Sequence, residues 1–297
     1  MAKWQTPWGA LWEQASEHVV NRGLSARNQL FFALRSQVHR PRLERLAPYE
    51  ERAESLEYCF SDRLKPARWQ ALADDLLARY RLEDFRPTRF RWLETLTVLH
   101  HLETLLPDAP SAGGHVHWLD VGAKNWSYVQ ALDAFARVGL KAPSVSLDGV
   151  EVDAYRRYTD GHCRLSYARA FCRHLPDARY VVADIRDWPG RASGEGYDVV
   201  TCFLPFVFVE PHLAWGLPGN LFSPQAFLSR VLSLLKPGGV LIITNQGEDE
   251  ASAQAALLAA CDGADQLEVT EYGVLPESLL KYHYPRYGWV VRRACAG

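Results

Sequence analysis

Three acidic residues end three separate apolar segments of the chain, and their types and spacing suggest a ligand site. Asp120 follows HVHWL, Glu151 comes near the end of VSLDGVEV, and Asp184 ends RYVVAD. Carboxylates accept hydrogen bonds from sugar hydroxyls or from an exocyclic amine. Gly122 follows Asp120 by two residues, and a glycine at the start of a helix lets a ligand approach the backbone N–H groups. The pattern predicts a site for a nucleotide-like ligand.

Each acid has a possible role in such a site and a simpler alternative. Glu151 could accept hydrogen bonds from both hydroxyls of a ribose, or it could be a surface acid at a strand end. Asp184 could accept from an amine such as that of adenine, with Val152 and Ile185 as apolar walls. Its alternative role is a helix cap for the residues from Arg186 onward.

The elements that must position these acids alternate between strand and helix from His115 to the C-terminus. Strands are expected at 115–120, 145–152, 179–184, 197–206, 239–244, 267–276 and 287–294, and helices at 128–138, 165–175, 224–235 and 251–261. Such alternation predicts a mostly parallel sheet covered by helices on both faces. Ligands of these sheets bind at the carboxyl ends of the strands. Asp120, Glu151 and Asp184 should therefore converge.

The first hundred residues have helical spacing instead, from Leu11 to about Leu106. One helix is expected to begin at Pro66 and another to run from about Thr88 to Leu106. The segment 107–114 (PDAPSAGG) has linker composition. We therefore expect a helical region, residues 1–110, that covers the ligand site and helps to select a substrate, followed by a Rossmann-like α/β domain, residues 115–297.

Composition narrows the classes of function. The net charge is −2 and the sequence pI about 6.6, so general binding to nucleic acid or to a membrane surface is not expected. The six cysteines include no C-x-x-C pair, which favours reduced thiols and a cytoplasmic protein. The spacing of His162, Cys163, Cys172 and His174 fits no standard zinc pattern, so no metal site is expected.

The α/β region resembles the class I S-adenosylmethionine-dependent methyltransferases. The matching segments are WLDVG, GVEVD, VVADIRDW, YDVVTCFLPF and LLKPGGVLIITN, in this order. The resemblance implies a seven-stranded sheet whose final strand is antiparallel, and S-adenosyl-L-methionine as cofactor. It places the turn residues Asp120, Gly122, Ala123 and Lys124 beside the methionine part, Glu151 and Val152 at the ribose, Asp184 and Ile185 at the adenine, and Phe203 and Leu204 near the transferable methyl group.

The glycine turn departs from that family. Its usual pattern, acid-x-Gly-x-Gly-x-Gly, is here Asp120-Val121-Gly122-Ala123-Lys124-Asn125-Trp126. Lys124 could pair with the carboxylate of the cofactor or block its pocket. Two alternatives to an active methyltransferase follow: a catalytically inactive binding or scaffold protein of the same fold, and an NAD-dependent oxidoreductase.

The segment after the fourth predicted strand bears on the acceptor. Phe203-Leu204-Pro205-Phe206 lacks the polar acceptor that methyltransferases acting on base amino groups often carry there. We therefore expect a small-molecule acceptor with an oxygen or nitrogen, and nucleic acid is not expected. Glu210 and His212, in the connection 207–222, are candidates for a base that deprotonates the acceptor. Both could equally be ordinary residues of a connecting loop.

Overall fold

A computed structural model describes residues 7–44, 66–85, 89–107, 114–191, 196–277, 279–280 and 282–295, with side chains of the helices described from residue 20 onward, from 68 and from 90. The chain forms two compact units. One consists of residues 1–38 and 206–224, and the other of residues 39–205 and 225–297. Each unit is described by itself, within these ranges.

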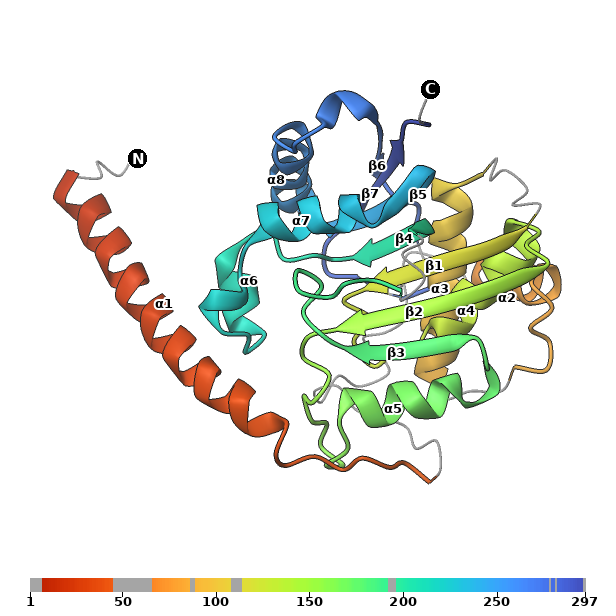
Figure 1. Cartoon of the computed structure of the whole chain (residues 1–297), viewed down its shortest axis with the longest axis horizontal. Coiled ribbons are helices and arrows are strands. Elements are labelled where there is room, and N and C mark those ends of the chain that lie inside the picture. Colours follow the sequence, from red (N-terminus) through yellow and green to blue (C-terminus); the bar gives the residue numbers. More distant parts are fainter. Residues whose placement is uncertain are drawn as a thin grey trace. The chain divides into compact units, whose positions relative to one another are not determined.

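The larger unit contains a seven-stranded sheet with the order β3-β2-β1-β4-β5-β7-β6. Its strands are β1 (His115–Val121), β2 (Ser144–Glu151), β3 (Ala178–Val182), β4 (Tyr197–Phe203), β5 (Leu235–Gln246), β6 (Leu267–Val274) and β7 (Arg286–Arg293). The arrows of β1 to β4 run in one direction (Figure 1), and only β7 pairs antiparallel, with both β5 and β6. The predicted Rossmann-like sheet with an antiparallel final strand is confirmed.

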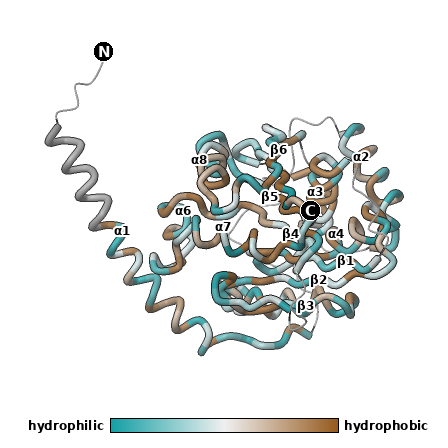
Figure 2. Tube along the Cα trace, turned by 45° about the horizontal axis from the view of Figure 1, so that its top comes forward, coloured by the Kyte–Doolittle hydropathy of each residue, from teal (hydrophilic) through white to brown (hydrophobic). Residues whose placement is uncertain are grey.

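Helices cover both faces of this sheet. On one face α2 (Pro66–Arg79), α3 (Arg89–Leu105), α4 (Val129–Ala134) and α5 (Arg164–Phe171) share a buried core with side chains of β1, β2 and β5. On the other, α7 (Pro224–Ser233) and α8 (Gly247–Ala259) pack with the alternate side chains of β1, β4 and β5. The hydrophobic colour of β5 in Figure 2 fits a strand buried on both faces.

The position of α2 and α3 bears on the predicted boundary between a helical region and an α/β domain. Leu93, Leu96 and Leu99 of α3 are fully buried in the same core as Trp118 of β1 and Leu132 of α4. Because these leucines share that core with the strands, α2 and α3 lie in the same compact unit as the strands. Residues 108–113 of the predicted linker at 107–114 lie outside the described part of the chain, and the division into residues 1–110 and 115–297 stays a prediction.

The structure corrects the expected position of Lys236-Pro237-Gly238-Gly239. We expected these residues to lie between a helix and a strand. The helix ends earlier, at Ser233, and these residues already belong to β5. The pairing of β5 with β4 is irregular between Tyr197 and Val199, and Gly238 takes a φ of +76° there. Lys236 Nζ also contacts both carboxylate oxygens of Asp198, at 2.9 and 2.8 Å. The pairing of Tyr197 with Leu235 lets β5 begin at Leu235, before the residues that we expected to form a turn.

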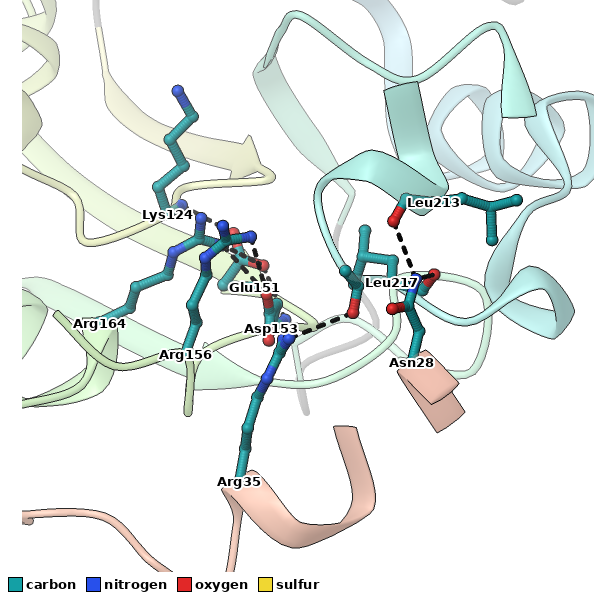
Figure 3. Close-up of polar contacts among 10 residues, drawn as sticks. Asn28, Arg35, Lys124, Glu151, Asp153, Arg156, Arg164, Leu213 and Leu217 are labelled. Carbon is teal, nitrogen blue, oxygen red and sulfur yellow. Dashed lines mark hydrogen bonds and ion pairs between the residues drawn. The ribbon is translucent and has the colours of Figure 1, made fainter. Parts of the chain in front are cut away.

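The smaller unit joins the long helix α1 (Pro7–Arg35) to the connection between β4 and α7. That connection contains a short helix, α6 (Val209–Ala214), which the sequence did not predict. Asn28 of α1 is buried, and its Nδ2 donates to the carbonyl oxygens of Leu213 and Leu217, at 2.8 and 2.9 Å (Figure 3). Ser25 Oγ accepts from the Gly219 N–H at 2.8 Å. These bonds attach α1 to backbone groups of the connection.

No helix among the described residues combines the length and the apolarity that a bilayer crossing requires.

Candidate active site

The turn after β1 keeps an unusual backbone although two of its expected glycines are absent. Gly122, Lys124 and Trp126 all have positive φ angles, of +76°, +51° and +53°. These are the three positions at which the family pattern has glycine. A side chain in this left-handed region costs about 1–3 kcal/mol. The chain therefore retains the turn geometry at the expense of strain at Lys124 and Trp126.

Neighbouring groups hold the strained turn in place. The N–H groups of Gly122 and Ala123 donate to the Val150 carbonyl of β2, at 2.9 and 3.3 Å. The Lys124 N–H donates to Glu151 Oε2 at 2.8 Å, and the Tyr180 hydroxyl of β3 donates to the Lys124 carbonyl. The turn is thus fixed by β2 and β3 together.

Trp126 fills the space behind the turn. Its ring is fully buried and lies 6.1 Å from the ring of Tyr180, centroid to centroid. A Cβ placed on Gly149 of β2 would come within 2.8 Å of the Trp126 ring, so the indole is pressed against the bare backbone of β2. The side of Gly122 is different: a Cβ there would meet no atom within 4 Å. The turn therefore has open space at the one position that kept its glycine.

Glu151, the predicted ribose acid, is buried and already bonded within the protein. Its Oε1 accepts from the Asp153 N–H at 2.7 Å, and its Oε2 from the Lys124 N–H at 2.8 Å. Arg164, at the start of α5 and itself buried, lies 3.5 Å from Glu151 Oε1 and 3.8 Å from Asp153 Oδ2 (Figure 3). In Figure 3 the Lys124 side chain leads away from this ion cluster.

The occupied oxygens limit what Glu151 can offer a ligand. Each carboxylate oxygen has two lone pairs. Oε1 already faces an N–H and an arginine, whereas Oε2 accepts, among the described residues, the hydrogen bond from the Lys124 N–H. Oε2 thus has the capacity to accept one further hydroxyl. The prediction that Glu151 binds a ribose stays open in this restricted form.

Asp184, the predicted adenine acid, lies two residues beyond the end of β3. Its Oδ1 accepts from the Arg186 N–H and from Arg186 Nε, both at 3.0 Å, and its Oδ2 lies 2.5 Å from Arg186 Nη2. Burial acts to raise the pKa of Asp184, but these bonds outweigh it and hold the pKa below its usual range. Residues 185–187 form a turn and no helix follows in the described residues before β4, so Asp184 binds the N–H and side chain of Arg186 in a turn, and the alternative of a helix cap is wrong.

The two predicted apolar walls differ in exposure. Ile185 is buried in the core beneath α7 and α8, together with Leu119 and Val150. Val152 is half-buried. The roles predicted for Asp184, Ile185 and Val152 at an adenine ring stay predictions.

Asp120 is fully buried at the centre of a polar network. Its Oδ1 accepts from Thr201 Oγ1 at 2.6 Å and its Oδ2 from the Tyr128 hydroxyl at 2.9 Å, and Trp118 Nε1 donates to Thr201 Oγ1 at 3.0 Å. Burial raises the pKa of Asp120 to about 7, against the opposing effect of the Thr201 and Tyr128 hydrogen bonds. Asp120 therefore connects β1, β4 and the helix after the turn.

This buried acid predicts a pH dependence of stability. The pKa of folded Asp120 lies above that of an unfolded aspartate, so the folded state binds the proton more tightly. Ionisation in the folded protein is unfavourable, and the wild type should lose stability as the pH rises from about 4 toward about 7. Relative to Asp120→Asn, which keeps the shape and cannot ionise, the wild type should be less stable at pH 8 than at pH 5. Urea denaturation of both proteins at these two pH values measures the difference, and an equal difference at both would contradict a raised pKa.

Phe203 and Leu204 form the end of β4, where the resemblance places the methyl group. Phe203 is half-buried and its ring lies 5.6 Å from that of Tyr128. Leu204 has a φ of +59° directly before Pro205, although a residue before proline strongly favours extended backbone. Its N–H donates to the Thr244 carbonyl of β5 at 2.8 Å. Leu204 is thus a further residue with strained backbone, in addition to Lys124 and Trp126. It lies at the carboxyl edge of the sheet, where strain often accompanies function.

The two candidate bases lie in the smaller unit. Glu210 is exposed, in the first turn of α6. His212 is buried between the rings of Phe206 and Phe222, 5.4 and 5.3 Å away. Its Nε2 lies 2.9 Å from the Pro218 carbonyl. Because a carbonyl only accepts, Nε2 carries the proton, and this nitrogen cannot act as a base while the bond is kept.

Several residues of the site had no signal in the sequence. Arg164 and Tyr180 reach the turn only because α5 and β3 fold against it, and neither belongs to a motif. Thr201 lies in the middle of an apolar strand, where a lone hydroxyl is unremarkable. One sequence feature could have pointed to Arg164: an arginine near the start of the helix that follows the acidic end of a strand.

Comparison with known proteins gives likenesses of structure. No protein-family model and no curated protein matches the sequence. Among solved structures, the precorrin-6y C5,15-methyltransferase of Geobacter metallireducens is similar at 13% identity and a TM-score of 0.42, with 80% of this chain and 94% of that chain covered. Magnesium protoporphyrin IX methyltransferase from Synechocystis PCC 6803, with bound SAM, is similar at 12% identity and a TM-score of 0.41, with 79% of this chain and 100% of that chain covered. An rRNA methylase from Streptococcus thermophilus is similar at 13% identity and a TM-score of 0.41, with 65% of this chain and 93% of that chain covered.

Proposed function

We propose that this protein is an S-adenosylmethionine-dependent methyltransferase that acts on an oxygen or nitrogen of a small molecule. The observation that carries the proposal is the turn 122–126. It keeps the left-handed backbone of a glycine motif at three alternate positions, two of them against the preference of their side chains. Strain of this kind persists where the surrounding structure maintains it, and it clusters at ligand sites.

The residues present fit an adenosyl and methionine group. Gly122 offers backbone beside open space, and Glu151 Oε2 can accept one hydroxyl in addition to the Lys124 N–H. Gly122 and Glu151 would hold the cofactor, which would supply an electrophilic methyl group on a sulfonium. The protein contributes alignment and exclusion of water, which can suffice for such a transfer. Where the acceptor must lose a proton, Glu210 and His212 stay the predicted bases, and Nδ1 of His212 keeps its lone pair while Nε2 donates to the Pro218 carbonyl.

A second candidate function is a non-catalytic binding protein with this fold. It is favoured by the ion pairs at both predicted cofactor acids, Glu151 with Arg164 and Asp184 with Arg186. In this case the acids serve the architecture, and the turn binds no S-adenosyl compound.

Calorimetric titration with S-adenosylmethionine, S-adenosylhomocysteine and NAD separates these functions. We expect both sulfur compounds to bind and NAD to give no heat. Absence of binding by both sulfur compounds would favour the non-catalytic protein, and heat with NAD alone would favour an oxidoreductase.

Gly122→Ala tests the place of binding, with Gly263→Ala as its matched control. Both glycines have left-handed backbone, at +76° and +75°, and a Cβ on either meets no atom within 4 Å. Both substitutions should therefore cost a similar stability, about 1 kcal/mol. Only Gly122→Ala adds an atom in the proposed pocket, and it should weaken binding of S-adenosylhomocysteine by about tenfold or more. Equal affinities of the two variants would place the cofactor elsewhere.

A further inference from the structure

A second polar cluster lies at the same carboxyl edge of the sheet, on the face that α3 covers. Gln246 is the last residue of β5 and Arg286 the first of β7, and the two are paired in register. Tyr282 precedes β7, and His101 belongs to α3. We call Gln246, Arg286, Tyr282 and His101 the Arg286 cluster. Neither the predicted cofactor site nor the candidate bases include any of these residues.

Arg286 carries a half-buried charge, and the two groups that it contacts, the Tyr282 ring and Gln246, are uncharged. Its guanidinium carbon lies 3.9 Å from the centroid of the Tyr282 ring, and its Nη1 donates to Gln246 Oε1 at 2.8 Å. No ion pair joins it to a carboxylate of the described residues. Glu250 is the acid that influences it, but Glu250 Oε2 accepts the Gln246 N–H, at 2.9 Å. A partly desolvated cation without an ion pair is costly, and an anion at the same place would offset that cost.

His101 provides the second observation. It is 6% exposed, and within the described part of the chain its Nε2 has no hydrogen-bond partner. Its ring lies 6.2 Å from that of Tyr282. Burial lowers the pKa of His101 to about 3, with a smaller effect in the same direction from Arg286, so the ring is neutral at physiological pH. A buried, unpaired ring nitrogen destabilises the protein, and a ligand oxygen that accepts from Nε2 would remove that cost.

The cluster lies close to the proposed site of methyl transfer. Gln246 follows Thr244 by two residues along β5, which corresponds to roughly 7 Å of strand. The Thr244 carbonyl accepts the N–H of the strained Leu204. A group held by Arg286 would thus be within one small molecule's length of the end of β4.

We propose that Arg286 and His101 bind a carboxylate of the methyl acceptor, so that the acceptor is a small carboxylic acid. Its role as acceptor rests on the proposed function, whereas binding of the anion does not. One guanidinium and one neutral imidazole carry a single positive charge, which matches a carboxylate better than a phosphate dianion. The planar guanidinium fork also matches the two oxygens of a carboxylate.

Ligand-observed NMR with simple probes tests this site without any cofactor. Benzoate should bind the wild-type protein, whereas benzamide, which has the same shape and no charge, should not. Arg286→Gln should weaken benzoate binding by about tenfold or more, the usual effect of losing a charged hydrogen-bond partner. Arg292→Gln is the matched control, because Arg292 lies at the other end of β7, opposite Val240, and it should leave benzoate binding unchanged.

The other outcomes decide against the proposal. Equal binding of benzoate to Arg286→Gln and wild type, or no binding to the wild type, would overturn it. Tighter binding of phenylphosphonate than of benzoate would reject a carboxylate in favour of a phosphate. Should Arg286→Gln fail to fold, His101→Phe provides the second test, with an expected loss of several-fold. Benzoate binding without any binding of S-adenosyl compounds would refute the methyltransferase and leave this anion site intact.

Discussion

Trp126→Gly is expected to lower the free energy of unfolding by about 1–4 kcal/mol, although glycine is the residue that the family pattern has there. Loss of a buried tryptophan side chain costs about 3–5 kcal/mol, and relief of the left-handed backbone returns only about 1–2 kcal/mol. The indole is fully buried against Gly149 and Tyr180. Restoring the glycine should therefore open a cavity behind the turn. Urea denaturation of the two proteins measures this difference.

Lys124→Gly is the matched control for this expectation. Lys124 has nearly the same φ, +51° against +53°, but its side chain is half-buried. Lys124→Gly relieves the backbone strain and removes little buried apolar volume. It should therefore leave the free energy of unfolding unchanged or raise it by up to about 1 kcal/mol. A Trp126→Gly protein as stable as Lys124→Gly would show that the indole does not support the turn.

Glu151→Ala is expected to cost about 3–5 kcal/mol of stability, because it leaves Arg164 as a buried charge with a poorer partner. Arg164 has 4% of its side chain exposed, and after the change Asp153 Oδ2, at 3.8 Å, would be the acid left in an ion pair with it among the described residues. The Lys124 N–H also loses its acceptor. Loss of cofactor binding by this variant would therefore not by itself identify a ribose contact. Thermal and urea denaturation should be measured before any titration.

Two further variants test this interpretation of Glu151. Asp184→Ala removes the acid of a more solvated pair, with side chains 23% and 17% exposed, and should cost about 1 kcal/mol. The double variant Glu151→Met with Arg164→Met removes both charges of the buried pair, and it should recover part of the loss. A double variant no more stable than Glu151→Ala would mean that the stability loss has another cause than the unpaired arginine.

The sequence alone determined the architecture of the larger unit. Alternating strand and helix periods are local properties, and they predicted all seven strands from β1 to β7 in order. The breaks at Gly122 and Pro224 are also local, because glycine and proline act through their own backbone. The acids at the strand ends followed from the same reading, since a parallel sheet brings its carboxyl ends to one edge.

Only the tertiary structure decided how those acids are used. Arg164 reaches Glu151 because the start of α5 is bonded to the segment after β2: the Arg164 N–H donates to the Arg156 carbonyl at 3.0 Å. Trp126 fits in place of a glycine because Gly149 makes room for its ring. The packing of α3 depends on the same kind of distant contact: its apolar face is visible in the sequence, but the surface that it buries is not. Hydrophobic periods depend on each residue's near neighbours along the chain. Hydrogen bonds, ion pairs and left-handed residues depend on groups far away along it, and these decide which carboxylates remain able to bind a ligand.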